Sequence, residues 1–328
     1  MGEPVGMVLC AGLGTRLSPL SDHVPKPAVP VCGLPLVRFS LALLAGAGVR
    51  RAVVNVHHLP AAMARVAEEA ARGLGIALAV SEERVIAGTG GALREARTLL
   101  AGADAIFLLN GDVLFDVDLR AVLAAHRATN ALATMVLLPM PAGARYATVE
   151  LDACGAVRRI AGAFGPGGAG LVPWHFSGVH VLSPEILDRV PAEPFECDVN
   201  RHVYPPLMGS GAVRGLVVDG YWNDLGTPAR YLEASRDVLV GRVPLEHFPG
   251  ADPYTGTREL SPGVRAAPDA AIDPTARLVA PVYVGARCTV PAGASLEDAV
   301  LWDETALAPA EAVKHAIAAG ALRVPAGA

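Results

Sequence analysis

The sequence contains very little lysine. Its 27 Lys and Arg residues include two lysines, Lys26 and Lys314, and the remainder are arginines. The two residue types are not interchangeable, because lysine carries a compact ammonium and arginine a planar fork of donors. The scarcity therefore favours a role for Lys26 that requires a compact ammonium group.

The sequence also lacks an excess of positive charge, a long apolar run and paired cysteines. Its net charge of −5 argues against a general nucleic-acid binder, which is usually basic. No apolar run would cross a bilayer without interruption, and the first ten residues lack the basic region of a signal peptide. The five cysteines are scattered without CxxC spacing, which argues against a disulfide framework or a zinc site. We therefore expect a cytoplasmic protein without a nucleic-acid or membrane partner.

The 328 residues, 52% of them hydrophobic, allow one large α/β domain and a smaller module. Strand-like and helix-like patterns alternate over residues 1–241, which predicts a mixed, mostly parallel sheet with helices on both faces. The expected strands are 5–10, 51–56, 76–80, 105–109, 133–138, 176–182 and 213–218. The expected helices are 34–47, 60–72, 90–100, 119–128, one beginning at 184, and 228–240. Ligands of such folds bind beyond the carboxyl ends of the strands.

A different pattern follows a proline-rich stretch, 242–264, that we interpret as a linker. Apolar residues recur every six positions, and a small or β-branched residue lies four residues after each of them. The two sets are Ile272, Leu278, Val284, Val290 and Leu296, and Ala276, Val282, Cys288, Ala294 and Val300. This period predicts that residues 265–328 form a short left-handed β-helix of hexapeptide repeats, followed by a terminal helix over 309–319. The alternative is a set of irregular strands with accidental spacing.

A glycine-rich loop, residues 12–16, follows the first expected strand. Such a loop lets backbone N–H groups approach phosphates, and Arg16 and Lys26 add charge that suits a polyphosphate. The loop is not a G-x-G-x-x-G motif, since Leu17 takes the last position, and no GK[ST] of a P-loop follows. Alone, it is also compatible with an ordinary strand–helix turn.

Two carboxylates, Asp112 and Asp224, each follow a strand-like run. If those strand ends converge, the pair can hold one Mg²⁺, a hard ion that keeps several waters and shares phosphate oxygens. The alternatives are a turn aspartate at 112 and a helix-flanking cap at 224. Asp116 and Asp118 follow closely, and for them helix capping is favoured over a second metal site.

Several segments together resemble the sugar-1-phosphate nucleotidyltransferases. GLGTRLSPL at 12–20 and PKP at 25–27 match the signature of that family. GTGGAL at 88–93 is similar to the second nucleotide-binding loop of the family, and NGD at 110–112 is similar to its metal-binding turn. FSGVHVL at 176–182 is similar to the strand that lines the sugar pocket, and YWNDLGTPARYLEA at 221–234 is similar to the segment that carries the second metal ligand. The resemblance implies a Rossmann-like catalytic domain that condenses a nucleoside triphosphate with a sugar 1-phosphate. It also implies a homo-oligomer assembled through the hexapeptide tail.

The resemblance assigns expected roles to individual residues. Arg16 and Lys26 stabilise the phosphates during transfer, and Asp112 and Asp224 bind Mg²⁺. Residues expected at the nucleotide are Ala11, Gly12, Gly14, Thr15, Glu82, Gly88, Thr89 and Gly90, with Glu83 an alternative to Glu82. Residues expected at the sugar phosphate are Asn110, Glu150, Ser177 and Gly178. Weaker candidates are Asn55, His57 and His58 as ligand contacts, and Trp222 is expected to pack.

One departure affects the substrate. Many members carry an E-K-P lysine that binds the sugar phosphate, whereas the matching region here, 157–164, reads VRRIAGAF. Arg158 and Arg159 are candidate substitutes, although they are not equivalent to lysine. N-acetylmuramate-1-phosphate uridylyltransferases also lack that motif, and mannose-1-phosphate guanylyltransferase-like proteins more often carry a hexapeptide tail. We expect GTP and mannose 1-phosphate, with UTP and an amino-sugar or muramate phosphate as the alternative. A non-catalytic subunit that senses nucleotide sugars is a further alternative.

Overall fold

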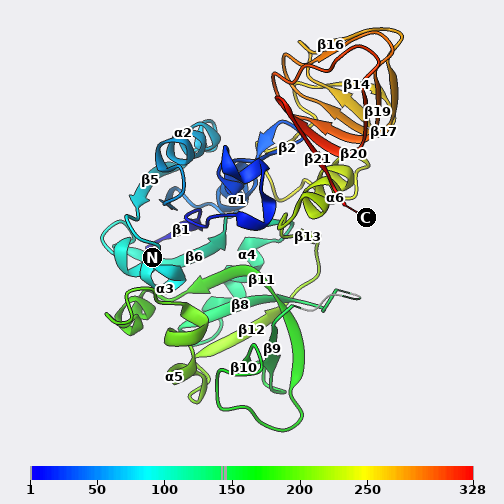
Figure 1. Ribbon diagram of the computed structural model, residues 1–328. Helices are drawn as coiled ribbons and strands as arrows, with labels where there is room; N and C mark the ends of the chain where they lie inside the picture. Colours follow the sequence, from blue (N-terminus) through cyan, green and yellow to red (C-terminus); the bar gives the residue numbers. More distant parts are fainter. Residues whose placement is uncertain (1, 142, 144–145, 328) are drawn as a thin grey trace.

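The computed structural model describes residues 2–141, 143 and 146–327, and it has a nine-stranded sheet at its centre (Figure 1). The order is β10-β9-β11-β6-β1-β4-β5, with β8 paired to β11 and β12 paired to β8. The strands are β1 (Glu3–Leu9), β4 (Arg51–Val56), β5 (Ala77–Glu82), β6 (Ala103–Asn110), β8 (Ala133–Leu138), β9 (Thr148–Leu151), β10 (Val157–Ile160), β11 (Val172–Leu182) and β12 (Val213–Val217). Two small pairs flank it, β2 (Pro30–Val31) with β3 (Leu34–Pro35) and β7 (Leu114–Phe115) with β13 (Trp222–Asn223).

The sheet is mixed, as expected. The run β5-β4-β1-β6 is parallel, and so is the pair β8–β12. The long strand β11 pairs in antiparallel fashion with β6, β8 and β9, and so joins the parallel run to the rest of the sheet. The two predicted strands 51–56 and 133–138 have the predicted bounds.

Helices cover both faces of the sheet because its central strands are apolar on both sides. In β6, Phe107 and Leu109 belong to one core, whereas Ile106 and Leu108 belong to the other. The first core contains α1 (Leu36–Gly46), α2 (Pro60–Ala71), α4 (Leu119–Arg127) and α6 (Pro228–Leu239). The second contains α3 (Gly88–Glu95), η4 (Pro184–Arg189), η5 (Val199–Val203) and α5 (Pro205–Met208). Three short 3₁₀ turns follow β1: η1 (Thr15–Leu17), η2 (Leu20–Asp22) and η3 (Lys26–Ala28).

The N-terminus of α4 confirms a capping role for one aspartate. The backbone N–H groups of Arg120 and Ala121 donate to Asp118 Oδ1 at 2.9 and 3.1 Å. These bonds satisfy two of the donors that a helix start leaves free. Asp118 is therefore occupied by the helix.

The C-terminal unit consists of β-strands (orange to red in Figure 1). They are β14 (Arg258–Ser261), β15 (Val264–Ala266), β16 (Ala271–Ile272), β17 (Arg277–Val284), β18 (Thr289–Val290), β19 (Ser295–Leu301), β20 (Ala312–Ala319) and β21 (Leu322–Pro325). Val264 lies opposite Val282, Leu278 opposite Leu296, and Leu296 opposite Val313, so each parallel neighbour is displaced by 17 or 18 residues. The residues of the predicted six-residue period lie inside: all ten are at least partly buried in a core.

Three expectations for chain segments are wrong in detail. The predicted terminal helix over 309–319 is strand β20, because pairing with β19 and β21 outweighs the helix propensity of its alanines. The last part of the expected linker, from Arg258 onward, forms β14 and pairs with β15. Helix α3 covers 88–95, and turns replace the rest of the predicted helix 90–100.

The C-terminal unit packs against α6. Tyr283, Val300, Ile317 and Val324 belong to the same apolar core as the buried face of α6. Trp302 Nε1 donates to the hydroxyl of Tyr231 on α6 at 2.8 Å, and that hydroxyl donates to the carbonyl of Pro30. The unit is thereby connected to the segment that carries Lys26.

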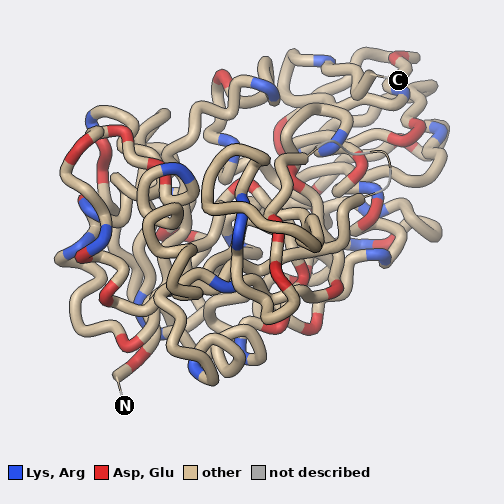
Figure 2. Tube along the Cα trace, turned by 90° about the horizontal axis from the view of Figure 1, so that it is seen from below, with Lys and Arg blue, Asp and Glu red and all other residues tan. Residues whose placement is uncertain are grey.

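Charged residues of both signs are mixed along the chain, as Figure 2 shows. This distribution agrees with the modest net charge of −5. Within the described residues, no helix has the length and apolarity needed to cross a membrane.

Candidate active site

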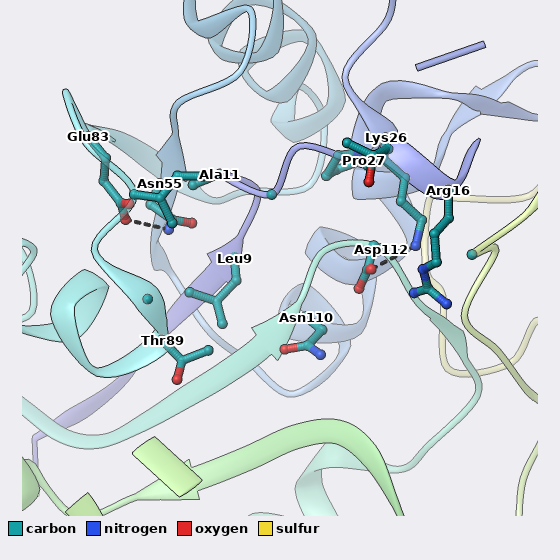
Figure 3. A pocket seen from close by; sticks show the side chains of 16 residues that line it. Leu9, Ala11, Arg16, Lys26, Pro27, Asn55, Glu83, Thr89, Asn110 and Asp112 are labelled. Carbon is teal, nitrogen blue, oxygen red and sulfur yellow. Dashed lines mark hydrogen bonds and ion pairs between the residues drawn. The ribbon is translucent and has the colours of Figure 1, made fainter. Parts of the chain in front are cut away.

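A cavity of about 330 Å³ lies at the carboxyl ends of three neighbouring strands (Figure 3). Leu9, the last residue of β1, is in register with Asn55 on β4 and with Asn110 on β6, so the segments that follow these strands meet at one edge. The lining residues are Leu9, Ala11, Gly12, Gly14, Thr15, Arg16, Lys26, Pro27, Asn55, Glu83, Ile86, Gly88, Thr89, Asn110, Asp112 and Gly226. Ten of the sixteen residues to which the resemblance assigns roles are in this set, together with the weaker candidate Asn55 and the alternative Glu83.

The glycine-rich loop packs tightly onto the lysine segment. Gly14 has a φ of +64°, and a Cβ built there would lie 3.0 Å from the Cβ of Lys26. Ser21 Oγ donates to the carbonyl of Gly14 at 2.9 Å. A side chain at position 14 would therefore strain the backbone and displace the lysine.

Lys26 is almost fully buried and brings the two predicted metal-binding aspartates together. Its Nζ donates to Asp112 Oδ2 at 2.7 Å and to the backbone carbonyl of Asp224 at 2.8 Å. The side chain of Lys26 is 6% exposed and that of Asp112 is 38% exposed. The ammonium group of Lys26 is therefore fixed by two hydrogen bonds, whereas the carboxylate of Asp112 is partly exposed at the cavity.

Gly226 leaves space between a positive and a negative group. A Cβ at this position would lie 3.2 Å from Asp224 Oδ2 and 3.3 Å from both terminal nitrogens of Arg16. The backbone N–H of Gly226 donates to Asp224 Oδ1 at 3.3 Å. Arg16 itself is exposed, and Figure 3 shows it beside Lys26, pointing toward Asp112.

The donor set fits a hard divalent cation. The ammonium of Lys26 binds Asp112 through its carboxylate and Asp224 through its backbone carbonyl, and the side chain of each aspartate carries carboxylate oxygens, the preferred donors of such an ion. Within the described residues, no group of three or more His, Cys, Asp or Glu side chains gathers for a metal. A cation here would take two protein ligands and complete its shell with water and phosphate oxygens.

A buried hydrogen-bond network closes the other end of the cavity. Asn55 Oδ1 accepts from the backbone N–H of Cys10 at 2.8 Å, and Asn55 Nδ2 donates to Glu83 Oε1 at 2.7 Å. Glu83 Oε2 accepts from the backbone N–H of Ala87 at 2.9 Å. This network joins the loop after β1 to the loop before α3. Burial, with a smaller contribution from Asp112, raises the pKa of the Cys10 thiol far above its ordinary value, so Cys10 stays protonated.

The start of α3 fits closely against the segment at 197–199. Gly88 has a φ of +73°, and a Cβ there would lie 2.6 Å from the carbonyl oxygen of Cys197. That carbonyl accepts from the backbone N–H of Gly90 at 2.7 Å, and Thr89 Oγ1 accepts from that of Val199 at 2.9 Å. The glycines therefore allow two backbone segments to approach each other.

Comparison with known proteins agrees with this geometry. A family described as nucleotidyl transferase matches residues 5–240. The chain belongs to this family. It is 30% identical over 300 residues to a mannose-1-phosphate guanylyltransferase of Mycobacterium tuberculosis. This match covers 90% of this chain and 79% of the relative. The match confirms the resemblance to sugar-1-phosphate nucleotidyltransferases.

Other relatives differ in name and coverage. A UTP–glucose-1-phosphate uridylyltransferase of Synechocystis sp. is 27% identical over 328 residues, which covers 92% of this chain and 84% of the relative. The catalytic subunit beta of a mannose-1-phosphate guanylyltransferase of Xenopus tropicalis is 29% identical over 234 residues, covering 69% of this chain and 62% of the relative.

The nucleotidyltransferase has an aromatic cluster beside Asp224. The rings of Tyr146 and His175 lie 4.4 Å apart, those of His175 and Trp222 lie 4.3 Å apart, and Trp222 Nε1 donates to the carbonyl of Ser177 at 2.8 Å. Burial lowers the pKa of His175 to about 4, with Asp224 raising it and Arg230 lowering it. His175 is therefore neutral at pH 7.

The residues predicted at the sugar phosphate are placed differently from one another. Asn110 lines the cavity, and Gly178, with a φ of +90°, packs against it. Ser177 is fully buried and its hydroxyl donates to the carbonyl of Val136 at 2.7 Å. Glu150 forms an ion pair with Arg159 at 3.5 Å.

Three of the predicted nucleotide and metal residues do not line the cavity. Glu82 is exposed, and its neighbour Glu83 lines the cavity instead. Gly90 packs against Cys197, and Asp224 lies just behind Gly226. Which of Glu82 and Glu83 faces the cavity depends on the register of β5 against β4, which a single sequence does not reveal.

Proposed function

We propose that this nucleotidyltransferase condenses GTP with mannose 1-phosphate to give GDP-mannose and pyrophosphate. The observation that carries the proposal is the cavity in which the glycine loop, Arg16, Lys26 and Asp112 meet beside Asp224. Two relatives named mannose-1-phosphate guanylyltransferase support the choice of substrates.

The residues at the end of the cavity that contains Arg16, Lys26 and Asp112 suit an in-line nucleotidyl transfer. An oxygen of the sugar phosphate attacks the α-phosphorus of GTP, a new O–P bond forms, and the bond to the pyrophosphate oxygen breaks. Arg16 and the backbone N–H groups of the loop bind the charge of the leaving pyrophosphate, and Lys26 binds the α-phosphate. A divalent cation, which we propose is Mg²⁺ held by Asp112 and Asp224, supplies further positive charge to the phosphate oxygens when bound.

The buried end of the cavity suits the base. Guanine presents N–H donors at its N1 and N2 positions, and a carboxylate is their natural acceptor. Glu83 lines the cavity with both carboxylate oxygens fixed by Asn55 and the N–H of Ala87. Each of these oxygens has a second lone pair, which favours GTP over UTP.

Pyrophosphate release from a matrix of nucleoside triphosphates and sugar 1-phosphates, with Mg²⁺, tests the proposal. Turnover that is highest with GTP and mannose 1-phosphate is the expected result. UTP with an amino-sugar or muramate phosphate is the second candidate, favoured by the absence of a lysine in 157–164, and preference for that pair would contradict the first choice. No turnover with any pair would contradict both.

For the rest of the chain, we propose a catalytic domain over 1–241 and a left-handed β-helix after the linker. The parallel displacement of 17 or 18 residues, three hexapeptides per coil, supports the β-helix. The edge strand β14, all four residues of which are exposed, supports assembly of a homo-oligomer through this unit, which light scattering would test. Five cysteines without a disulfide support a cytoplasmic location.

A further inference from the structure

The proposed reaction brings two phosphate-bearing molecules to the aspartate pair, and each needs cations. Arg16 and Lys26 line the cavity on the nucleotide side. The sugar phosphate also requires a positive group near the aspartate pair, because phosphate is bound chiefly by charge-assisted hydrogen bonds.

The two arginines that the sequence suggested for this role pair with carboxylates other than Asp112 and Asp224. Arg158 Nε donates to Asp152 Oδ2 at 2.6 Å, and this carboxylate has a pKa lowered mainly by that hydrogen bond. Arg159 Nε lies 3.5 Å from Glu150 Oε2. Neither of these pairs includes Asp112 or Asp224, the two predicted metal ligands.

Arg230 lies beside Asp224, outside the set of residues that line the cavity. Its Nε donates to Asp224 Oδ1 at 3.3 Å, and its guanidinium lies over the ring of Trp222, 5.7 Å from the centroid. Its Nη1 is 3.5 Å from Glu233 on the next turn of α6, and its side chain is 33% exposed. The start of α6, capped by Thr227, therefore holds a partly exposed arginine at the aspartate.

The wall beside Arg230 contains unused hydrogen-bonding capacity. Both ring nitrogens of His175 are buried and have no hydrogen-bond partner within the described part of the chain, and the residue as a whole is 3% exposed. An unpartnered buried polar group is costly and calls for an explanation, such as a ligand that completes it. The ring centroids of Tyr146 and Trp222 lie 5.3 Å apart, so the phenol, the imidazole of His175 and the indole form one aromatic wall beside Arg230.

We infer that Arg230 binds the phosphate of the sugar 1-phosphate, against the wall formed by Tyr146, His175 and Trp222. This inference rests on the proposed function. Arg230 donates to a phosphate oxygen through nitrogens not engaged by Asp224, and Trp222 keeps the guanidinium oriented.

Steady-state kinetics of Arg230→Gln with GTP, mannose 1-phosphate and Mg²⁺ test the inference. Loss of a charge-assisted hydrogen bond raises the KM for mannose 1-phosphate about 10- to 100-fold and leaves the KM for GTP nearly unchanged. Arg230→Lys, which keeps the charge, recovers part of the loss. Arg158→Gln is the matched control and keeps the wild-type KM for both substrates.

Two results overturn the inference. If Arg230→Gln changes the Mg²⁺ concentration required for activity but not the KM for mannose 1-phosphate, Arg230 only positions Asp224. If Arg158→Gln carries the effect instead, the phosphate lies elsewhere.

Failure of the proposed function is distinguishable, because the wild type would then release no pyrophosphate. Calorimetric titration with mannose 1-phosphate alone then decides: weaker binding to Arg230→Gln than to wild type supports the inference, and equal binding or no binding to either contradicts it.

Discussion

Replacing Lys26 by methionine separates the catalytic contribution of the ammonium from its structural contribution. The ammonium makes two hydrogen bonds, to Asp112 and to the carbonyl of Asp224. Without it, the carbonyl loses a buried partner, which costs about 1–3 kcal/mol of folding free energy. Asp112 is 38% exposed, so water replaces most of its lost partner and little is added.

The expected catalytic loss is larger than the loss of stability. Removing one preorganised group that stabilises developing charge lowers kcat about 10²- to 10³-fold, or about 2.7–4 kcal/mol. Pyrophosphate release measures the first quantity, and urea unfolding followed by tryptophan fluorescence measures the second. The control is Lys314→Met: this lysine is 58% exposed and paired with Glu297, so its loss changes stability by about 0.5 kcal/mol at most and leaves kcat unchanged.

Lys26→Arg tests the preference for a compact group. The pocket around Lys26 is closed, since the side chain is 6% exposed and its Cβ lies against Gly14. A planar guanidinium does not fit there without displacing the loop, so kcat stays well below wild type. Wild-type kcat in Lys26→Arg would refute the argument from compactness, and wild-type kcat in Lys26→Met would refute any catalytic role.

The remaining predictions concern stability. Gly88→Ala lowers the free energy of unfolding by about 1–3 kcal/mol, because the φ of Gly88 is +73° and the new Cβ would meet the Cys197 carbonyl. A free energy of unfolding in urea equal to that of the wild type would contradict this. Burial raises the pKa of Asp298, but hydrogen bonds from Arg236 and His315 outweigh it and hold that pKa below its ordinary value. A lowered folded-state pKa gives stability that is present above about pH 4 and is lost as the pH falls through the folded value. Asp298→Asn is therefore less stable than wild type at pH 7, and the difference shrinks below pH 4; a difference independent of pH would exclude this linkage.

Much of the fold follows from local pattern. The apolar runs of β4 and β8 and the cap at Asp118 depend on residues adjacent in the chain, and their bounds or roles were predicted correctly. The loop after β1 and the NGD turn were placed at strand ends, and the parallel register brings them to one cavity.

The errors come from interactions between segments distant in sequence. Strand β20 has an alanine-rich sequence that suits a helix, and its pairing with β19 decides otherwise. Which of Glu82 and Glu83 faces the cavity depends on the register of β5 against β4. The position of Arg230 beside Trp222 and Asp224 requires the whole segment from β13 to α6 to be folded.

The packing of the C-terminal strands against α6 has a consequence for synthesis. A ribosome releases the chain from its first residue to its last, so α6 emerges before β17, β19, β20 and β21 exist to cover it. Until those strands emerge, the part of the apolar face of α6 that packs against Tyr283, Val300, Ile317 and Val324 is left in water. The apolar core that includes α6 is therefore completed only after the C-terminal strands have been synthesised, and a chaperone that recognises exposed apolar segments is expected to bind this helix in the interval.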